Sequence, residues 1–193
     1  MAPTIIYLHG FLSVGNSEKA RTLREALPDQ SHLSPDLTFD PDDNLRVISD
    51  LLATLPKAPV IFVGTSLGGF WAHYFAQTTG NPCVIVNPCI QPSQSFKDRC
   101  GDYPNYVTGE KVSVTPQALA RYRDLERDLE AIYDPKRAHL LLAQDDDVLP
   151  CGPAMRAFEG CSTLVVTESG GHRFTSEWHR AIEVLKQACT HLW

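Results

Sequence analysis

Five short, mostly apolar runs stand out along the chain, and each has the length of a buried β-strand. They occupy residues 4–8, 60–63, 83–86, 139–143 and 162–167. The region of residues 28–43 is rich in Pro, Asp and Ser, and residues 32–37 within it are a candidate sixth strand. Apolar character that continues from residue to residue is typical of strands covered on both faces of a parallel sheet.

Between these runs lie segments whose apolar residues recur at the three- and four-residue spacing of one helix face. A further helix is expected over residues 70–80, and a short one begins near Pro153. Strands that alternate with helices predict the α/β class, with a mostly parallel sheet of about five to six strands and helices on both faces. The apolar stripes are Ala20, Leu23 and Leu27; Leu45, Ile48, Leu52 and Leu55; Leu119, Tyr122, Leu125, Leu129 and Ile132; and Trp178, Ile182, Leu185, Cys189 and Leu192.

Residues 88–135 interrupt this alternation. The segment begins as a proline-punctuated loop, shows no clear periodicity around Tyr103 and Tyr106, and continues as a charged helix after Thr115. Because sites in α/β sheets lie at the carboxyl ends of the strands, we interpret it as a small lid-like insertion above them. The alternative is an ordinary surface excursion. The whole chain, residues 1–193, is expected to form a single α/β domain.

The composition narrows the function classes. The net charge is −6 and no basic tract is present, which argues against a nucleic-acid partner. No apolar run has the length of a membrane span, and the N-terminus lacks the pattern of a signal peptide. The six cysteines are scattered without C-x-x-C spacing, so we expect free thiols and a cytoplasmic location. No H-E-x-x-H motif or Cys/His cluster suggests a metal, and we expect no cofactor.

The first candidate catalytic residue lies shortly after the apolar run at residues 60–63. Residues 64–68, Gly-Thr-Ser-Leu-Gly, fit G-x-S-x-G between a strand and a helix, which is the context of a nucleophile elbow with Ser66 at its tip. The alternative is a chance match in a glycine-rich turn. The loop after the first strand is where such enzymes find one oxyanion-hole amide, so the N–H groups of Phe11 and Leu67 are the candidate pair. His9, at the same strand end, is expected to order the loop rather than to act as a base.

An acid and a base follow in the order Ser, Asp, His that is typical of α/β-hydrolases. Asp145, Asp146 and Asp147 come after the strand at 139–143, and His172 lies on a glycine loop after the last strand. His73 stands seven residues beyond Ser66, about 10 Å along the helix. The remaining histidines lack a surrounding motif or fall inside the closing helix: His32, His139, His179 and His191.

Five sequence blocks, YLHGF, GTSLGG, VNPCIQP, the Asp-Asp-Val-Leu run and GGHRF, resemble those of small bacterial YqiA-type (YcpF-type) esterases over essentially the whole chain. The resemblance implies a compact α/β-hydrolase fold that acts on carboxylic esters or acyl thioesters. It places the nucleophile at Ser66, the acid at Asp146 and the base at His172. One departure is that Asp145 stands where relatives usually have glycine, which makes three consecutive aspartates.

The predicted function is hydrolysis of small acyl esters of short to medium chain through an acyl-enzyme. Phe96, Tyr103 and Tyr106, in the lid-like segment, are expected to line an apolar acyl pocket of modest size. The alternatives are an acyl-CoA thioesterase, a peptidase, or a binding protein that kept the fold and lost catalysis. The sequence leaves the oligomeric state open.

Overall fold

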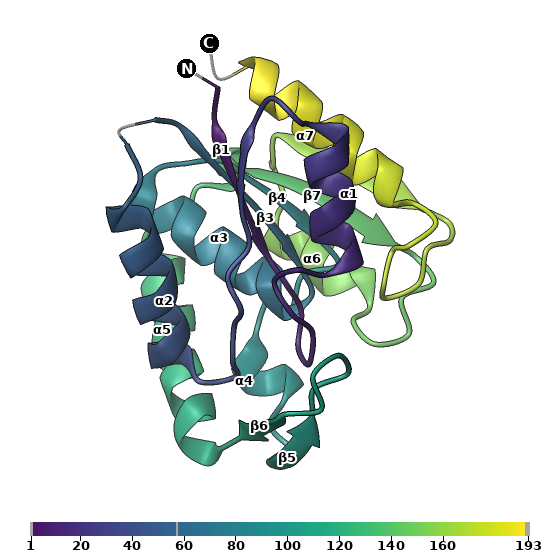
Figure 1. The fold of residues 1–193 in the computed structure, drawn as a ribbon. Helices are drawn as coiled ribbons and strands as arrows, with labels where there is room; N and C mark the ends of the chain where they lie inside the picture. Colours follow the sequence, from purple (N-terminus) through teal and green to yellow (C-terminus); the bar gives the residue numbers. More distant parts are fainter. Residues whose placement is uncertain (1, 57, 192–193) are drawn as a thin grey trace.

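A six-stranded sheet forms the centre of the molecule (Figure 1). The computed structural model describes residues 2–56 and 58–191. In this part of the chain the strands lie in the order β2-β1-β3-β4-β7-β8, and every neighbouring pair is parallel. The predicted α/β architecture is therefore confirmed. The strands are β1 (Thr4–Leu8), β2 (Ser31–Leu33), β3 (Val60–Thr65), β4 (Cys83–Val86), β7 (Ala138–Ala143) and β8 (Thr163–Thr167).

Strand β2 is shorter than the stretch of residues 32–37 that the sequence suggested. It pairs with β1 through three residues and ends before Pro35. Proline has no N–H to donate to a strand ladder, so it stops the pairing on this edge of the sheet.

Helices cover both faces of the sheet, because successive side chains of the buried strands point to opposite sides. Ile5, Ile61 and Val63 face α1 (Glu18–Ala26) and α7 (Trp178–His191). Ile6 and Phe62 belong to the second core, to which four other helices contribute (Figure 1). These helices are α2 (Pro41–Ala53), α3 (Leu67–Thr79), α5 (Pro116–Ala131) and α6 (Cys151–Ala157).

The apolar stripes that predicted the helices fall on them, with four exceptions. Leu27 directly follows the last residue of α1, as its C-cap. Leu55 lies beyond the end of α2, because the following Pro56 disfavours helical backbone at the residue before it. Ile132 lies beyond α5 and its side chain is 46% exposed. Leu192 falls outside the described residues.

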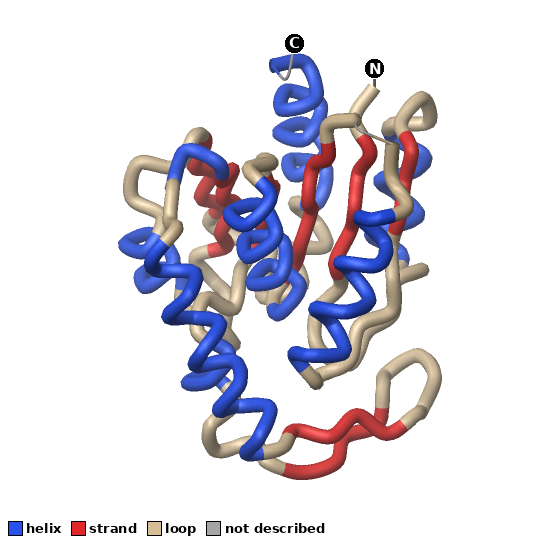
Figure 2. The backbone as a smooth tube through the Cα atoms, turned by 90° about the vertical axis from the view of Figure 1, so that its left-hand side faces the viewer, coloured by secondary structure: helices blue, strands red, loops and turns tan. Residues whose placement is uncertain are grey.

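The segment 88–135 contains more structure than its sequence pattern predicts. It includes the short helix α4 (Pro92–Ser95) and an antiparallel hairpin of β5 (Gly101–Pro104) and β6 (Lys111–Val114), followed by α5 and a 3₁₀ turn, η1 (Pro135–Arg137). The hairpin lies apart from the main sheet, on the side of its carboxyl ends (Figure 2). Helix α5 instead packs into the core, with Tyr122 fully buried. No helix in the described part of the chain is long and apolar enough to cross a bilayer.

Candidate active site

Ser66 occupies a sharp turn between β3 and α3. Its backbone φ is 53°, a left-handed value that is uncommon for any residue other than glycine. Three main-chain hydrogen bonds hold the turn: the Ser66 N–H donates to Val86, and the Ser66 carbonyl accepts from Gly69 and Cys89. A strained backbone that its surroundings hold in this way is a common feature of functional sites.

The two glycines of the G-x-S-x-G motif have a steric role. A Cβ atom on Gly64 would lie 2.1 Å from the carbonyl oxygen of Gly68, and one on Gly68 would lie 2.0 Å from the carbonyl oxygen of Leu8. Both oxygens belong to the main chain and cannot swing aside. Helix α3 can therefore begin this close to β1 and β3 only if both positions are glycine. The turn has the geometry of a nucleophile elbow.

A series of hydrogen bonds joins Ser66 to His172 and His172 to Asp146. The Nε2 atom of His172 lies 2.9 Å from Ser66 Oγ, and its Nδ1 atom lies 2.9 Å from Asp146 Oδ2. A carboxylate can only accept, so Nδ1 carries the proton and Nε2 is left to accept from the Ser66 hydroxyl. The structure brings the three side chains together from the turn after β3, the loop after β7 and the loop after β8.

The carboxylate of Asp146 is fully buried and well satisfied. Its Oδ1 accepts from the N–H groups of Val148 and Leu149 at 2.9 and 2.8 Å. Burial alone would raise the pKa of Asp146, but the hydrogen bonds from His172, Leu149 and Val148 outweigh burial and hold the pKa below its ordinary value. Asp146 is therefore ionised at neutral pH and stays fixed in position.

The two neighbouring aspartates point elsewhere. The Oδ1 atom of Asp145 accepts from the main-chain N–H of Gly171 at 2.7 Å. Asp145 therefore holds the loop that carries His172 and does not bond the imidazole itself. Asp147 is exposed, and no hydrogen bond or ion pair joins its side chain to the described residues. Only Asp146, of the three, reaches His172.

Asn87, which the sequence analysis did not single out, is part of the same assembly. It directly follows β4, is 2% exposed and has a positive φ of 42°. Its Nδ2 donates to the main-chain oxygens of Gly171 and His172 at 2.9 and 3.2 Å, and its Oδ1 accepts from Ala143 at 2.9 Å. One buried amide thus joins the ends of β4 and β7 to the His172 loop. Two sequence signals could have indicated it: its position immediately after a buried strand and its place in the VNPCIQP block.

The predicted role of His9 in ordering its loop agrees with its contacts. Its Nε2 accepts from the Leu37 N–H at 2.9 Å, so its Nδ1 carries the proton and donates to the Gly10 carbonyl at 2.8 Å. Burial lowers the pKa of His9. His73 is also buried, and burial lowers its pKa to about 4. Its ring packs edge-on against Phe158, away from Ser66.

The loop of residues 9–11 lies directly against Ser66. A Cβ atom on Gly10 would be 3.2 Å from Ser66 Cβ and 3.8 Å from its Oγ. The next residue, Phe11, and the first residue of α3, Leu67, border the same small cavity. Within the described chain, neither of their main-chain N–H groups donates to another residue. Two main-chain N–H groups without a partner in the described chain therefore border this cavity, one in the loop against Ser66 and one on the residue directly after Ser66.

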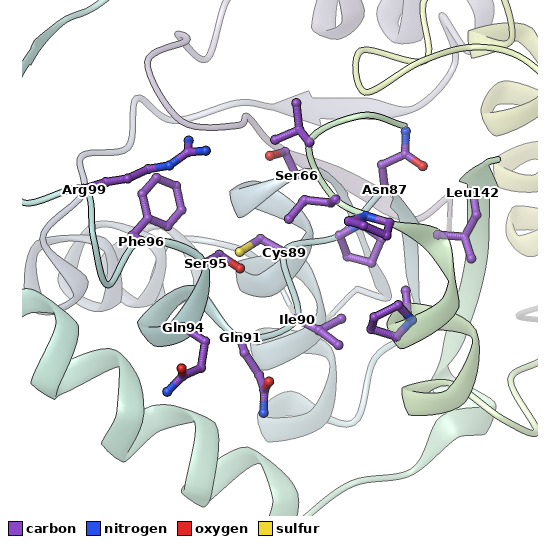
Figure 3. A pocket seen from close by; sticks show the side chains of 16 residues that line it. Ser66, Asn87, Cys89, Ile90, Gln91, Gln94, Ser95, Phe96, Arg99 and Leu142 are labelled. Carbon is purple, nitrogen blue, oxygen red and sulfur yellow. The ribbon is translucent and has the colours of Figure 1, made fainter. Parts of the chain in front are cut away.

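A cavity of about 300 Å³ adjoins Ser66 (Figure 3). Its walls come from the chain after β4, residues 87–99, and from the segment 148–154 that leads into α6. Of the three predicted substrate contacts, Phe96 lines this cavity. Tyr103 and Tyr106 do not: the Tyr103 hydroxyl donates to the Arg99 carbonyl, and the Tyr106 side chain is 73% exposed. The wall formed by residues 148–154 was not predicted from the sequence, because its position depends on how β7 and α6 pack.

The described residues contain no group of three or more His, Cys, Asp or Glu side chains that could hold a metal ion.

Solved structures with the same fold are α/β-hydrolases. The chain superposes on Est1E from Butyrivibrio proteoclasticus with a TM-score of 0.69 at 15% identity, over 96% of this chain and 86% of that one. It superposes on the Paleococcus ferrophilus monoacylglycerol lipase with a TM-score of 0.70 at 14% identity, over 98% and 96% of the two chains. Identities this low establish the fold alone.

Sequence relatives cover nearly the whole chain. A UPF0227 protein of Shewanella sp. strain ANA-3 is 26% identical over 176 residues, which is 88% of this chain and 90% of that protein. A UPF0227 protein of Pectobacterium carotovorum subsp. carotovorum strain PC1 is 27% identical over 179 residues, which is 89% and 91% of the two. The sequence model of the family described as "Uncharacterised protein family (UPF0227)" matches residues 4–188. With this extent of match, the chain belongs to the UPF0227 family.

Proposed function

We propose that this chain is a serine hydrolase that cleaves carboxylic esters of short to medium acyl chain by two-step transfer of the acyl group to water. The observation that carries the proposal is the hydrogen-bonded series from Ser66 through His172 to the buried carboxylate of Asp146, with 2.9 Å at both contacts. Such a series activates a serine hydroxyl, which is otherwise a weak nucleophile at neutral pH.

In the first step, Ser66 Oγ attacks the ester carbonyl carbon while His172 Nε2 takes its proton. The imidazolium then gives that proton to the oxygen of the leaving alcohol as the ester C–O bond breaks, which leaves the acyl group on Ser66. Asp146 stabilises the imidazolium and keeps Nδ1 protonated. Its lowered pKa suits this role, because the carboxylate remains charged throughout the working pH range.

The negative charge that develops on the carbonyl oxygen needs nearby donors. The N–H groups of Leu67 and Phe11 are the proposed pair, supported by the closeness of their loops to Ser66 and by their lack of other partners within the described chain. Leu67 also begins α3, so the positive end of the helix dipole favours an anion there. Loss of one donor of this kind typically costs about 10²–10³ in rate.

In the second step, water attacks the acyl-enzyme with His172 again as the base, and Ser66 is regenerated. No metal or cofactor takes part in the proposed reaction. Residues 88–135 act in this proposal as the lid-like part of one domain, since Phe96 and the residues around α4 wall the cavity beside Ser66. We place the enzyme in the cytoplasm, in keeping with six cysteines that are present as thiols.

A fluorophosphonate probe tests the proposal directly, because it labels only a serine whose hydroxyl is activated. We expect labelling of the purified wild-type chain and hydrolysis of aryl esters, with neither in Ser66→Ala, whose fold is checked by circular dichroism. Near-wild-type turnover in Ser66→Ala would overturn the mechanism. A folded wild-type chain that is neither labelled nor active would favour a catalytically silent binding protein. Acyl-CoA thioesters in the same assay test the thioesterase alternative.

A further inference from the structure

The cavity beside Ser66 contains an unbalanced positive charge. Arg99 is the one formally charged residue among those that line it, and no carboxylate shares the lining. The rest of its polar lining is neutral: the serines Ser66 and Ser95 and the amides Asn87, Gln91 and Gln94. Arg99 is exposed, and a lone charge that borders a concave site acts on a ligand there more strongly than the same charge on an open surface.

The main chain of Arg99 is fixed while its guanidinium is not engaged. The Arg99 N–H donates to Phe96 and its carbonyl accepts from the Tyr103 hydroxyl, both at 2.9 Å. The guanidinium lies 5.9 Å from the centroid of the Phe96 ring. Within the described residues it forms no hydrogen bond or ion pair, whereas Arg46, Arg121 and Arg137 each pair with an aspartate. Arg99 therefore keeps all of its donors for another partner.

The ring beneath Arg99 is itself held in place. Phe96 is 7% exposed, and its ring contacts those of Phe11 and Phe39 at centroid distances of 4.9 and 4.8 Å. A guanidinium that rests on a fixed aromatic face loses less freedom when it binds a ligand. Figure 3 shows the head group of Arg99 extending past Phe96 toward the part of the cavity where Ser66 lies.

We propose that Arg99 binds an anionic group of the substrate, so that the preferred esters carry a carboxylate in addition to the ester bond. The five donors of a guanidinium form a planar fork that matches a carboxylate with two parallel hydrogen bonds. The chain has a net charge of −6, which disfavours the approach of anions at long range, so a local cation would favour such a substrate. The proposal rests on the function proposed above and adds the substrate class.

The test compares matched esters with and without the charge. On the acyl side, the pair is 4-nitrophenyl hydrogen adipate and 4-nitrophenyl hexanoate. On the alcohol side, it is 3-acetoxybenzoate and methyl 3-acetoxybenzoate. Spontaneous hydrolysis is subtracted, and kcat/KM is measured at several salt concentrations for the wild type, Arg99→Gln, Arg99→Lys and Lys97→Gln. Lys97 is a matched control, because it is an exposed cation two residues away that does not line the cavity.

We expect the wild type to prefer the anionic ester of at least one pair, and the pair identifies the side of the ester bond that faces Arg99. Arg99→Gln should lower the anionic-to-neutral ratio of kcat/KM about tenfold, mainly through KM. Arg99→Lys should retain part of the ratio, and Lys97→Gln should leave it unchanged. Salt should reduce the wild-type preference. An unchanged ratio in Arg99→Gln, or a neutral-ester preference in both pairs, would overturn the proposal. Wild-type inactivity on all four esters would instead count against the proposed function.

Discussion

The side-chain nitrogen of Asn87 lies 3.2 Å from the main-chain oxygen of His172 and donates to it. The same nitrogen donates to Gly171, and the side-chain oxygen accepts from Ala143 at the end of β7. The proposed base therefore lies on a loop whose main chain is tied to the sheet beside the proposed nucleophile. General-base catalysis requires the base to stay within hydrogen-bond reach of the hydroxyl, so this tie is expected to matter for rate as well as for stability.

Replacement of Asn87 with glycine should lower kcat about 10- to 100-fold, because small displacements of a base can cost this much. Glycine keeps the positive φ of 42° at this position, so the loss reports the missing amide rather than backbone strain. The measurement is kcat together with the rate of fluorophosphonate labelling, both corrected for the folded fraction. Asn16→Gly, which removes an exposed amide that bonds Arg24, is the control. A folded Asn87→Gly enzyme with wild-type kcat would contradict this role.

The three consecutive aspartates should differ sharply when each becomes asparagine. Asp146→Asn should cost about 10⁴ in kcat, because an amide at this position disrupts the protonation state of His172 that the reaction needs. Asp145→Asn should be mild, since an amide oxygen can still accept from Gly171. Asp147→Asn should have almost no effect. Rates at one fixed pH decide the order, and the assignment of Asp146 fails if its variant is the mildest of the three.

Gly68→Ala should destabilise the fold severely. The added Cβ would meet the Leu8 carbonyl oxygen at 2.0 Å, a main-chain contact that no side-chain rotation relieves. The expected loss in the free energy of unfolding exceeds about 3 kcal/mol, the upper range of ordinary overpacking. Urea unfolding measures it. Gly152→Ala is the control, since its Cβ would meet only the Arg156 side chain, at 3.5 Å. Equal stability of the two variants would contradict the steric role of the elbow.

Burial of His73 should make stability fall in mild acid. The pKa of His73 is lowered from 6.5 to about 4, so between these pH values the unfolded chain binds a proton that the native chain does not. The contribution of neutral His73 to the free energy of unfolding is complete above pH 6.5. It declines by about 3 kcal/mol in total as the pH drops toward about 4. His73→Phe keeps a ring against Phe158 and should flatten the pH dependence of the unfolding free energy. His179→Asn, an exposed control, should leave it unchanged.

The volume of the cavity should limit the acyl group. About 300 Å³ is at the small end of the range for ligand pockets, so kcat/KM should peak at short to medium acyl chains and then fall. A series of aryl esters below their micelle concentrations measures this profile. Ala154→Leu, in the cavity wall, should move the peak to shorter chains, whereas Ala157→Leu, on the exposed face of α6, should not. A profile that keeps rising to long chains would contradict the prediction.

The sequence was most informative where a local pattern determines local structure. The apolar run at 60–63, the glycines around Ser66 and the Thr115-Pro116 pair at the start of α5 each predict an element that the structure contains. Thr115 caps α5 through its side chain, which accepts from the Ala118 N–H. Such features depend on neighbours within a few residues, so one sequence is enough to recognise them.

The sequence was least informative where the partner is distant along the chain. Asn87 donates hydrogen bonds to Gly171 and His172, which lie 84 and 85 positions further along the chain. Hairpin β5–β6 consists of two four-residue strands in which half of the residues are exposed and only one is buried, so no apolar periodicity marks it. Tyr103 packs on the Phe11 ring instead of lining the cavity beside Ser66. These placements depend on tertiary packing, which local propensity does not encode.

The separation of Ser66 from His172 by 106 residues has a consequence for a chain that is still being synthesised. The elbow needs β1, β3 and β4, all of which precede residue 87. The loop that carries His172 is positioned only after β8 has paired with β7. A nascent or truncated polypeptide that stops short of β8 would therefore contain the proposed nucleophile without the proposed base, and we expect it to be inactive.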